Sequence, residues 1–308
     1  MSLPPSVPSH PVYIPAYAKV NLTLAVLGRR ADGYHRLSSV MQTISLHDTL
    51  RLSAAKAREP KRVTCFCDLD GLPMAENLAY RAAILLQRAA CVTAGVSIEA
   101  QKVIPAQGGL GGGSSDAAAI LNALNILWAV GYDAARLEAL GAQLGSDVPF
   151  FIGGGTALIE GRGEVVTPLP DAESLWYVLV KPPVAVSTAA VFGSLDPAEY
   201  DDATASEALV AAIRAGEPLP FERLSNTLER GVMQVYPAIA AARDALLASG
   251  APIVRMSGSG PTLYAPFRTL AEAATVYRCF CEREQTGRAA NIAWLCHTVS
   301  REQATNRW

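Results

Sequence analysis

The chain has 308 residues, a formal net charge of −2 at pH 7 and a pI near 6.1. Half of its residues are hydrophobic and 18% are charged, which is typical of a packed globular protein and excludes a disordered chain. The balanced charge, with no run of Lys or Arg, excludes the basic surface that a nucleic-acid-binding protein needs. Because single cores stop growing near this length, we expect two domains.

The N-terminal residues, the apolar runs and the cysteines indicate in which compartment of the cell the protein is found. Residues 1–11 contain four prolines and no basic region followed by an apolar run, so they predict a disordered tail and not a signal peptide. No apolar run approaches the roughly 20 residues of a membrane span. The six cysteines include no Cys-x-x-Cys pair, which favours reduced thiols over a zinc site. We therefore expect a cytoplasmic protein.

The first predicted elements are strands. Polarity alternates over residues 18–26, which predicts a half-buried strand with Lys19, Asn21 and Thr23 on its polar face. Residues 28–33 have the composition of a turn, and residues 40–53 predict further strand. A helix over 79–91 and a strand over 96–104 follow.

A glycine-rich loop comes directly after that strand. Five of the six residues 108–113 are glycine, and a helix is predicted over 117–130 with Ser114 as its N-cap. Strand, glycine loop and helix together favour a phosphate site, because backbone N–H groups can approach an anion at a helix N-terminus. A flexible linker is the alternative. The loop is neither a Walker motif, since Gly-Lys-Ser/Thr is absent, nor a dinucleotide motif, since Ser114 stands where a third glycine is needed.

The rest of the chain predicts a second domain. A helix over 134–144 and two short strands within 153–170 complete the first domain, residues 12–172. The second domain, residues 173–300, is predicted to contain a strand at 176–180 and helices at 205–215, 236–249 and 271–283. Its residues 253–256 and 262–265 are arranged as the arms of a tight loop, and a last strand lies near Ala293. Residues 301–308 are expected to be a tail.

Two charged residues become candidates for chemistry when they are combined with the loop. Lys19 alone is most simply part of a solvated strand face, and Asp147 alone a turn or capping residue. Together they suit phosphoryl transfer, in which an aspartate accepts the proton of the attacking hydroxyl and a lysine neutralises developing charge. Backbone N–H groups of residues 257–260 could extend the phosphate site, and a plain hairpin turn is the alternative there.

Three segments resemble, in this order, the motifs of the GHMP kinases, the superfamily of galactose, homoserine, mevalonate and phosphomevalonate kinases. They are the glycine-rich loop, residues 145–149 (Gly-Ser-Asp-Val-Pro) and residues 256–261 (Met-Ser-Gly-Ser-Gly-Pro). Residues 30–35 (Arg-Ala-Asp-Gly-Tyr-His) and the inserted glycines Gly112 and Gly113 are similar to one branch. That branch phosphorylates the 2-hydroxyl of a cytidine diphosphate derivative of methylerythritol. The resemblance covers about residues 15–297.

The resemblance implies a two-domain α+β GHMP kinase fold, with an N-terminal ribosomal-protein-S5-domain-2-like domain and a C-terminal ferredoxin-like α/β sandwich. It implies Lys19 and Asp147 as the catalytic pair, ATP as cosubstrate, and Mg²⁺ with ligands that we leave unassigned. The implied ATP-binding residues are Pro105, Ala106, Gln107, Gly108, Gly109, Leu110, Gly111, Gly112, Gly113, Ser114, Ser115, Asn77, Lys102, Ser257 and Gly258. The implied substrate-binding residues are Asn21, Tyr34, His35, Thr188 and Phe192.

An expectation about partners and two alternative functions complete the hypothesis. The partner is a small-molecule substrate, with no nucleic acid and no membrane, and the protein is a monomer or weak homodimer. Another GHMP kinase, acting on homoserine or mevalonate, would not need Tyr34 and His35. A non-catalytic nucleotide sensor on the same fold would be expected to lack Lys19 and Asp147.

Overall fold

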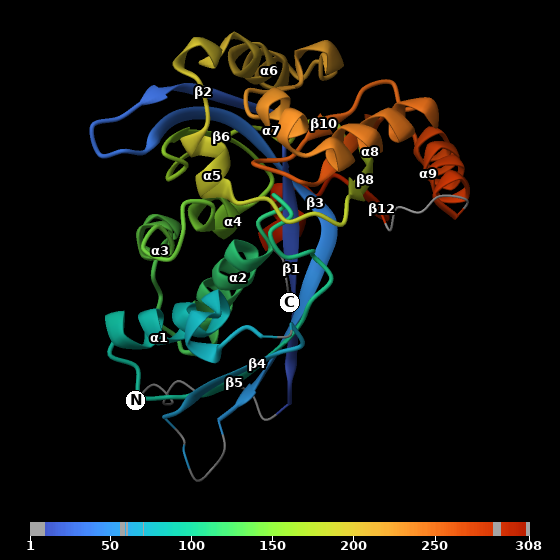
Figure 1. Ribbon diagram of the computed structural model, residues 1–308. Coiled ribbons are helices and arrows are strands. Elements are labelled where there is room, and N and C mark those ends of the chain that lie inside the picture. Colours follow the sequence, from blue (N-terminus) through green and yellow to red (C-terminus); the bar gives the residue numbers. More distant parts are fainter. Residues whose placement is uncertain (1–9, 56–58, 60, 70, 286–290, 306–308) are drawn as a thin grey trace.

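Two β-sheets with helices packed against them make up the described residues, 10–55, 59, 61–69, 71–285 and 291–305 of the computed structural model (Figure 1). The first sheet has eight strands and the second has four. Each half of the chain contains both strands and helices, which alternate irregularly along the sequence, so the predicted α+β class is confirmed.

The first sheet is built around one long strand, β3 (His35–Ala54). This strand pairs antiparallel with four others, β1, β2, β5 and β6, because its 20 residues are long enough to have different partners along their length. The remaining strands are β1 (Val12–Asn21), β2 (Thr23–Arg29), β4 (Val63–Cys67), β5 (Val96–Gln101), β6 (Thr156–Gly161), β7 (Val165–Pro168) and β9 (Ser225–Asn226). In Figure 1, β1 and β3 run side by side along the molecule.

Helices cover one side of this sheet. They are the 3₁₀ turn η1 (Met74–Glu76) and the helices α1 (Leu78–Ala89), α2 (Gly112–Leu127), α3 (Ala134–Gly141), α4 (Val148–Gly153) and α10 (Arg301–Thr305). The central helix, α2, packs on α1, α3, α4 and β1. Its alanine-rich sequence is buried from Ser115 to Leu121, as expected for a helix that is apolar on nearly every side.

The second sheet has the order β10-β11-β8-β12 and is antiparallel throughout. Its strands are β8 (Trp176–Lys181), β10 (Arg255–Met256), β11 (Leu263–Phe267) and β12 (Ile292–His297). The accompanying helices are α5 (Thr188–Gly193), η2 (Pro197–Glu199), α6 (Thr204–Ala215), η3 (Phe221–Arg223), α7 (Glu229–Val235), α8 (Pro237–Ala248) and α9 (Leu270–Gln285). In Figure 1, α8 and α9 lie beside this sheet.

The two halves share a core. Val20 of the first sheet and Leu179 and Tyr264 of the second belong to one buried hydrophobic cluster. Strand β9 comes from the second half of the chain and pairs in parallel with β2 of the first sheet. Strands before residue 172 belong to the first sheet, and those after it belong to the second, except for β9. Because β9 joins the first sheet from the second half of the chain, the division into domains 12–172 and 173–300 stays a prediction.

Several local predictions differ from the structure. Helix α2 begins at Gly112, and its N-cap is Gly111 in the left-handed conformation, so Ser114 is not the N-cap. The predicted strand over 18–26 is interrupted at Leu22, and both of its faces are buried. Residues 301–305, expected in a tail, form α10, where Ala304 is buried. The predicted N-terminal tail falls mostly on residues outside the described ranges.

Candidate functional site

A cavity of about 1080 Å³ lies where the two halves of the chain meet, between loops of the first sheet and residues 258–260. Its walls bring together segments that are far apart in the sequence. The predicted site residues that line it are Lys19, Asn21, Tyr34, His35, Gln107, Gly109, Gly111, Ser114, Asp147, Thr188, Phe192 and Gly258.

Lys19 is a buried cation at the floor of this cavity. Its Nζ donates to Asn21 Oδ1 at 2.5 Å and lies 3.7 Å from Asp147 Oδ2. Burial lowers the pKa of Lys19, and the neighbouring Asp147 carboxylate partly opposes that shift. Lys19 and Asn21 both lie on β1, and their side chains point the same way because alternate side chains of a strand share a face.

Asp147 lies at the beginning of α4, but its side chain makes no capping hydrogen bond. Asp147 therefore does not cap α4 through its side chain, which is the ordinary structural role of an aspartate at this position. Its side chain is one-third exposed, whereas that of Lys19 is 3% exposed. A carboxylate that is open to the cavity, anchored by a buried cation, is placed to interact with a molecule in the cavity.

The glycine loop is held against β1 and against residues 257–262. Lys19 N donates to Leu110 O at 3.1 Å, and Ser257 Oγ donates to Gly109 O at 2.9 Å. Gly109 and Gly111 adopt φ of +75° and +73°, a region that favours glycine. A Cβ on Gly111 would lie 2.7 Å from the Phe151 ring. The loop therefore turns closely at the N-terminus of α2, whose first N–H groups have no intrahelical partner.

Aromatic residues gather at another part of the wall. The rings of His35 and Phe192 have centroids 5.4 Å apart, and Tyr200 contacts His35 edge-on at 6.1 Å. The Tyr34 ring is more than half exposed, and the Arg162 guanidinium lies 5.0 Å from its centroid. Burial, and then the charge of Arg29, lowers the pKa of His35, which favours a neutral ring at pH 7. This wall offers flat apolar faces with hydrogen-bonding edges.

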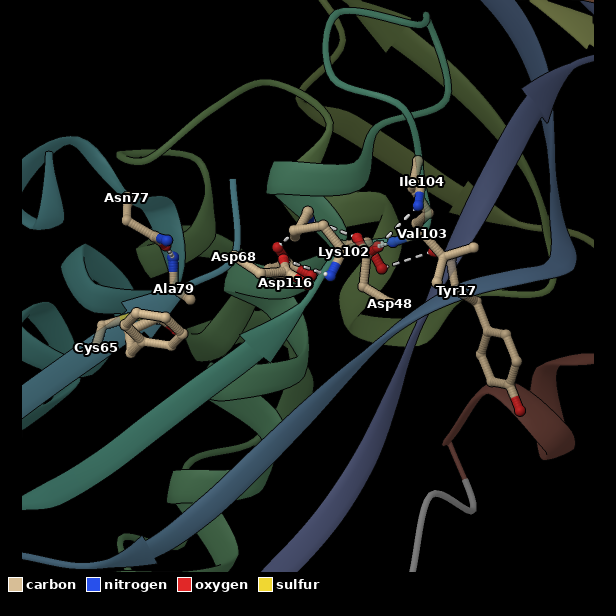
Figure 2. Close-up of polar contacts among 12 residues, drawn as sticks. Tyr17, Asp48, Cys65, Asp68, Asn77, Ala79, Lys102, Val103, Ile104 and Asp116 are labelled. Atoms are coloured by element: carbon tan, nitrogen blue, oxygen red, sulfur yellow. Dashed lines mark hydrogen bonds and ion pairs between the residues drawn. The ribbon is translucent and has the colours of Figure 1, made fainter. Parts of the chain in front are cut away.

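Lys102 lies below the loop, between two carboxylates, as Figure 2 shows. Its Nζ donates at 2.5 Å to both Asp48 Oδ2 and Asp116 Oδ2. Asp48 Oδ1 also accepts the backbone N–H groups of Val103 and Ile104, at 2.6 and 2.8 Å. This buried cluster joins β3, the segment after β5 and the first turns of α2. The ammonium group of Lys102 thus donates to two carboxylates of the protein itself. Its predicted contact with the nucleotide stays a prediction.

The other predicted ATP-binding residues do not line the cavity. Asn77 caps α1, because its Oδ1 accepts Ala79 N at 2.8 Å. The Ser115 hydroxyl donates to Tyr17 O at 2.6 Å and the residue is fully buried. The remaining residues of this kind are Pro105, Ala106, Gly108, Leu110, Gly112, Gly113 and Ser257. They belong to the loops that shape the site.

Sequence reasoning missed several lining residues. Arg29, Arg162 and Tyr236 line the cavity from three separate segments. Arg162 lies in a turn between two glycines, and nothing in that pattern indicates which way its side chain points. Ser259 was within reach of prediction, since it lies in the loop already singled out, and its Oγ is 2.8 Å from Thr188 Oγ1.

Metal-site geometry and membrane-spanning helices are not found in the described parts of the chain. No group of three or more His, Cys, Asp or Glu side chains there is arranged to hold a metal ion. None of the helices in those ranges combines the length and the hydropathy of a bilayer-spanning segment.

Comparisons with known proteins agree with this geometry. Residues 77–155 match the GHMP kinases N terminal domain, and residues 209–285 match the GHMP kinases C terminal domain. The 4-diphosphocytidyl-2-C-methyl-D-erythritol kinase of Heliobacterium modesticaldum is 40% identical over 94% of this chain and 96% of that protein. The protein of that name from Pelotomaculum thermopropionicum is 46% identical over 81% of this chain and 86% of its own length.

A solved structure gives the same indication. The crystal structure of a 4-(cytidine 5'-diphospho)-2C-methyl-D-erythritol kinase superposes with a TM-score of 0.77 at 35% identity. The alignment covers 93% of this chain and 99% of that one. Similarity therefore extends through both halves of the molecule.

Proposed function

Since this chain belongs to the family of 4-diphosphocytidyl-2-C-methyl-D-erythritol kinases within the GHMP kinases, and is therefore an ATP-dependent kinase, we propose that it phosphorylates the 2-hydroxyl of 4-diphosphocytidyl-2-C-methyl-D-erythritol. The products are the 2-phosphate and ADP, in the non-mevalonate route to isoprenoid precursors. The observation that carries the proposal is the pairing of Lys19 with Asp147, 3.7 Å apart, in a cavity shared with the glycine loop.

The proposed reaction is direct transfer without a covalent enzyme intermediate. Asp147 accepts the proton of the substrate's 2-hydroxyl as its oxygen forms a bond to the γ-phosphorus of ATP. The bond between that phosphorus and the β,γ-bridging oxygen breaks, and ADP leaves. Lys19 keeps Asp147 oriented and offsets negative charge that develops on the transferred group. The absence of a capping bond on Asp147 supports this role, because its oxygens remain available.

The proposed ATP site is the glycine loop with residues 257 and 258. Backbone N–H groups near the N-terminus of α2 bind the phosphates, and the left-handed glycines bring the backbone close to them. Residues such as Leu110 and Ser115 act through the loop's shape, since both are buried. The contacts of Asn77 and Lys102 with the adenine are part of the same proposal.

The proposed site for the cytidine end is the aromatic wall. Tyr34 and Phe192 present ring faces on which a cytosine can stack, and a neutral His35 can both donate and accept at the edge of the base. Asn21 and Thr188 supply polar groups along the path from this wall to Lys19.

The donor set fits Mg²⁺ held mainly by ATP. Asp147 is the only carboxylate among the described residues that line the cavity, and Ser114 lines it near the loop. Mg²⁺ commonly keeps one or two protein oxygens and takes the rest from phosphates and water. The Ser114 hydroxyl would be its protein ligand, and the ion would neutralise charge on the β- and γ-phosphates. The cytoplasmic location and a monomeric or weakly dimeric state remain predictions.

An acceptor comparison tests this function. The purified protein with ATP and Mg²⁺ should release ADP with 4-diphosphocytidyl-2-C-methyl-D-erythritol and not with mevalonate, homoserine or galactose. Turnover with one of the other acceptors would keep the kinase and refute the substrate. No turnover with any of the four would favour a nucleotide sensor on this fold.

The Tyr34→Ala variant separates this substrate from those of other GHMP kinases. Removing the ring deletes a stacking face worth about 1–3 kcal/mol, so KM for the cytidine substrate should rise roughly tenfold or more. KM for ATP should stay near the wild-type value, because the glycine loop is untouched. An unchanged KM for the cytidine substrate would remove Tyr34 from the site.

A further inference from the structure

A second pocket, of about 500 Å³, lies in the C-terminal half between α7, α8 and the strands β9 and β10. It shares no lining residue with the cavity described above. Its volume is within the range of small-ligand sites, about 300–1,000 Å³. Among the described residues, its charged lining consists of three arginines and one glutamate: Arg230, Arg243, Arg255 and Glu229. The pocket is therefore cationic although the chain as a whole is slightly acidic.

The arginines are held in different ways. Arg255 donates from Nε to Leu224 O at 2.6 Å and from Nη1 to Val254 O at 2.9 Å, so its acceptors are neutral carbonyls. Arg243 pairs with Asp244 on the same helix at 2.9 Å, and Arg230 lies 4.0 Å from Glu199. The pairs of Arg243 and Arg230 are exposed and easily exchanged. A planar guanidinium matches phosphate oxygens with two parallel hydrogen bonds.

Glu229, the one carboxylate that lines the pocket, is engaged elsewhere. Its Oε2 accepts the backbone N–H of Met256 at 3.3 Å. Burial raises its pKa, against the attraction of Arg255.

The pocket wall is hydrogen-bonded directly to the proposed catalytic cavity. Asn226 lines the pocket, and its Nδ2 donates to both Met256 O and Gly258 O at 2.8 Å. Gly258 lines the catalytic cavity, and Ser257 holds Gly109 of the glycine loop. A ligand that moved Asn226 or Glu229 would thus displace residues 256–260, and with them one side of the ATP site.

We propose that this pocket binds a small phosphate-bearing anion and that binding there changes turnover by shifting residues 256–260. The ligand changes turnover only if it binds more tightly to a shifted position of this loop than to the one in the structure. The binding part of the proposal does not depend on which acceptor the enzyme phosphorylates.

Binding is tested with inorganic pyrophosphate as the probe, measured by titration calorimetry. A saturating non-hydrolysable ATP analogue occupies the glycine loop, so that the probe cannot bind there. The double variant Arg230→Gln/Arg243→Gln should bind pyrophosphate roughly tenfold or more weakly, because charge-assisted hydrogen bonds are lost. Arg214→Gln removes one positive charge, against two in the double variant, from the exposed surface of α6 and should bind as the wild type does. Equal affinity in all three proteins, or no binding to the wild type, would refute the site.

Coupling is tested by ADP release at constant free Mg²⁺, since pyrophosphate chelates the ion. Pyrophosphate should change kcat or the KM for ATP about twofold or more in the wild type and in Arg214→Gln. The double variant should have normal activity without the probe and little response to it. Binding that leaves the kinetics of the wild type unchanged would refute the coupling. Failure of the acceptor assay alone leaves the calorimetric test intact, so the two proposals fail separately.

Discussion

At the scale of single residues, Gly109 explains why the glycine loop needs a residue without a side chain. Its φ is +75°, and an added Cβ would lie 2.1 Å from Ser257 O, a backbone atom that cannot swing away. Ser257 O also accepts Gly260 N at 3.0 Å, so movement there would disturb the loop of the C-terminal half. One missing side chain therefore lets the two loops touch.

The Gly109→Ala variant measures that contact. The left-handed backbone and the forced displacement should together lower the free energy of unfolding by about 2–5 kcal/mol. Gly216→Ala is the matched control, because Gly216 has φ of +69° and open space around its Cβ position. The control should cost only about 1–2 kcal/mol. Equal losses in urea denaturation would show that the contact with Ser257 O contributes nothing.

At the scale of elements, the start of α2 depends on the cluster of Lys102, Asp48 and Asp116. Burial most of all, and also Asp48, raises the pKa of Asp116 from 3.8 to about 7, against the attraction of Lys102. Asp116 Oδ1 has no hydrogen-bond partner among the described residues, which is consistent with a carboxyl that can hold a proton. The glycine loop thus leads into a helix with a titratable group beneath its first turn.

A pH series tests this cluster. The folded state holds the proton of Asp116 more tightly than the unfolded chain, so the contribution is largest below pH 3.8 and is lost as pH rises towards 7. Asp116→Asn cannot ionise. The Tm of the wild type relative to Asp116→Asn should therefore fall between pH 5 and pH 8. A relative Tm that rises with pH would contradict the raised pKa.

At the scale of the whole molecule, hydrogen bonds join β1 and β2 to the second half of the chain. Tyr264 of β11 is fully buried, and its hydroxyl donates to Asn21 O at 2.9 Å. Asn21 N donates to Ser257 Oγ at 3.3 Å, and Thr23 Oγ1 lies 2.8 Å from Ser206 Oγ. The position of Lys19 thus depends on both halves of the chain.

The Tyr264→Phe variant removes one of these bonds and keeps the ring. It should lower the free energy of unfolding by about 1–2 kcal/mol, because a buried carbonyl loses its partner. It should also lower kcat while the KM for ATP changes less, since Asn21 contacts Lys19. Exposed Tyr13→Phe should be neutral in both measurements. Full activity in a destabilised Tyr264→Phe would show that the bond serves stability alone.

The sequence predicts the parts of this molecule whose signals are local or carried by motifs. Alternating polarity and helical composition give most strands and helices, and the motif resemblance leads to Lys19 and Asp147. The N-cap of α2 was missed because a capping serine is the usual signal, whereas this helix begins on a left-handed glycine that leaves its N–H groups open. Helix α4 has six residues, too few for a periodic pattern.

Other features depend on distant contacts and leave no local signal. Lys19 is buried beside two distant loops, since the Cβ positions of Gly111 and Gly258 lie 3.4 Å from its Cγ and 3.3 Å from its Nζ. The strand face that the sequence predicts to be solvated is therefore enclosed. Strand β9 has two residues and owes its pairing to β2. Arg162 reaches the cavity only because the turn between β6 and β7 folds over Tyr34.

The most direct test of the central claim is the kinetics of Asp147→Asn with ATP and 4-diphosphocytidyl-2-C-methyl-D-erythritol. Loss of the proton acceptor should lower kcat about 10²–10⁴-fold. The Kd of a non-hydrolysable ATP analogue should remain close to that of the wild type, because the glycine loop is unaltered. A kcat near the wild-type value would contradict the pairing of Lys19 and Asp147 as the centre of phosphoryl transfer.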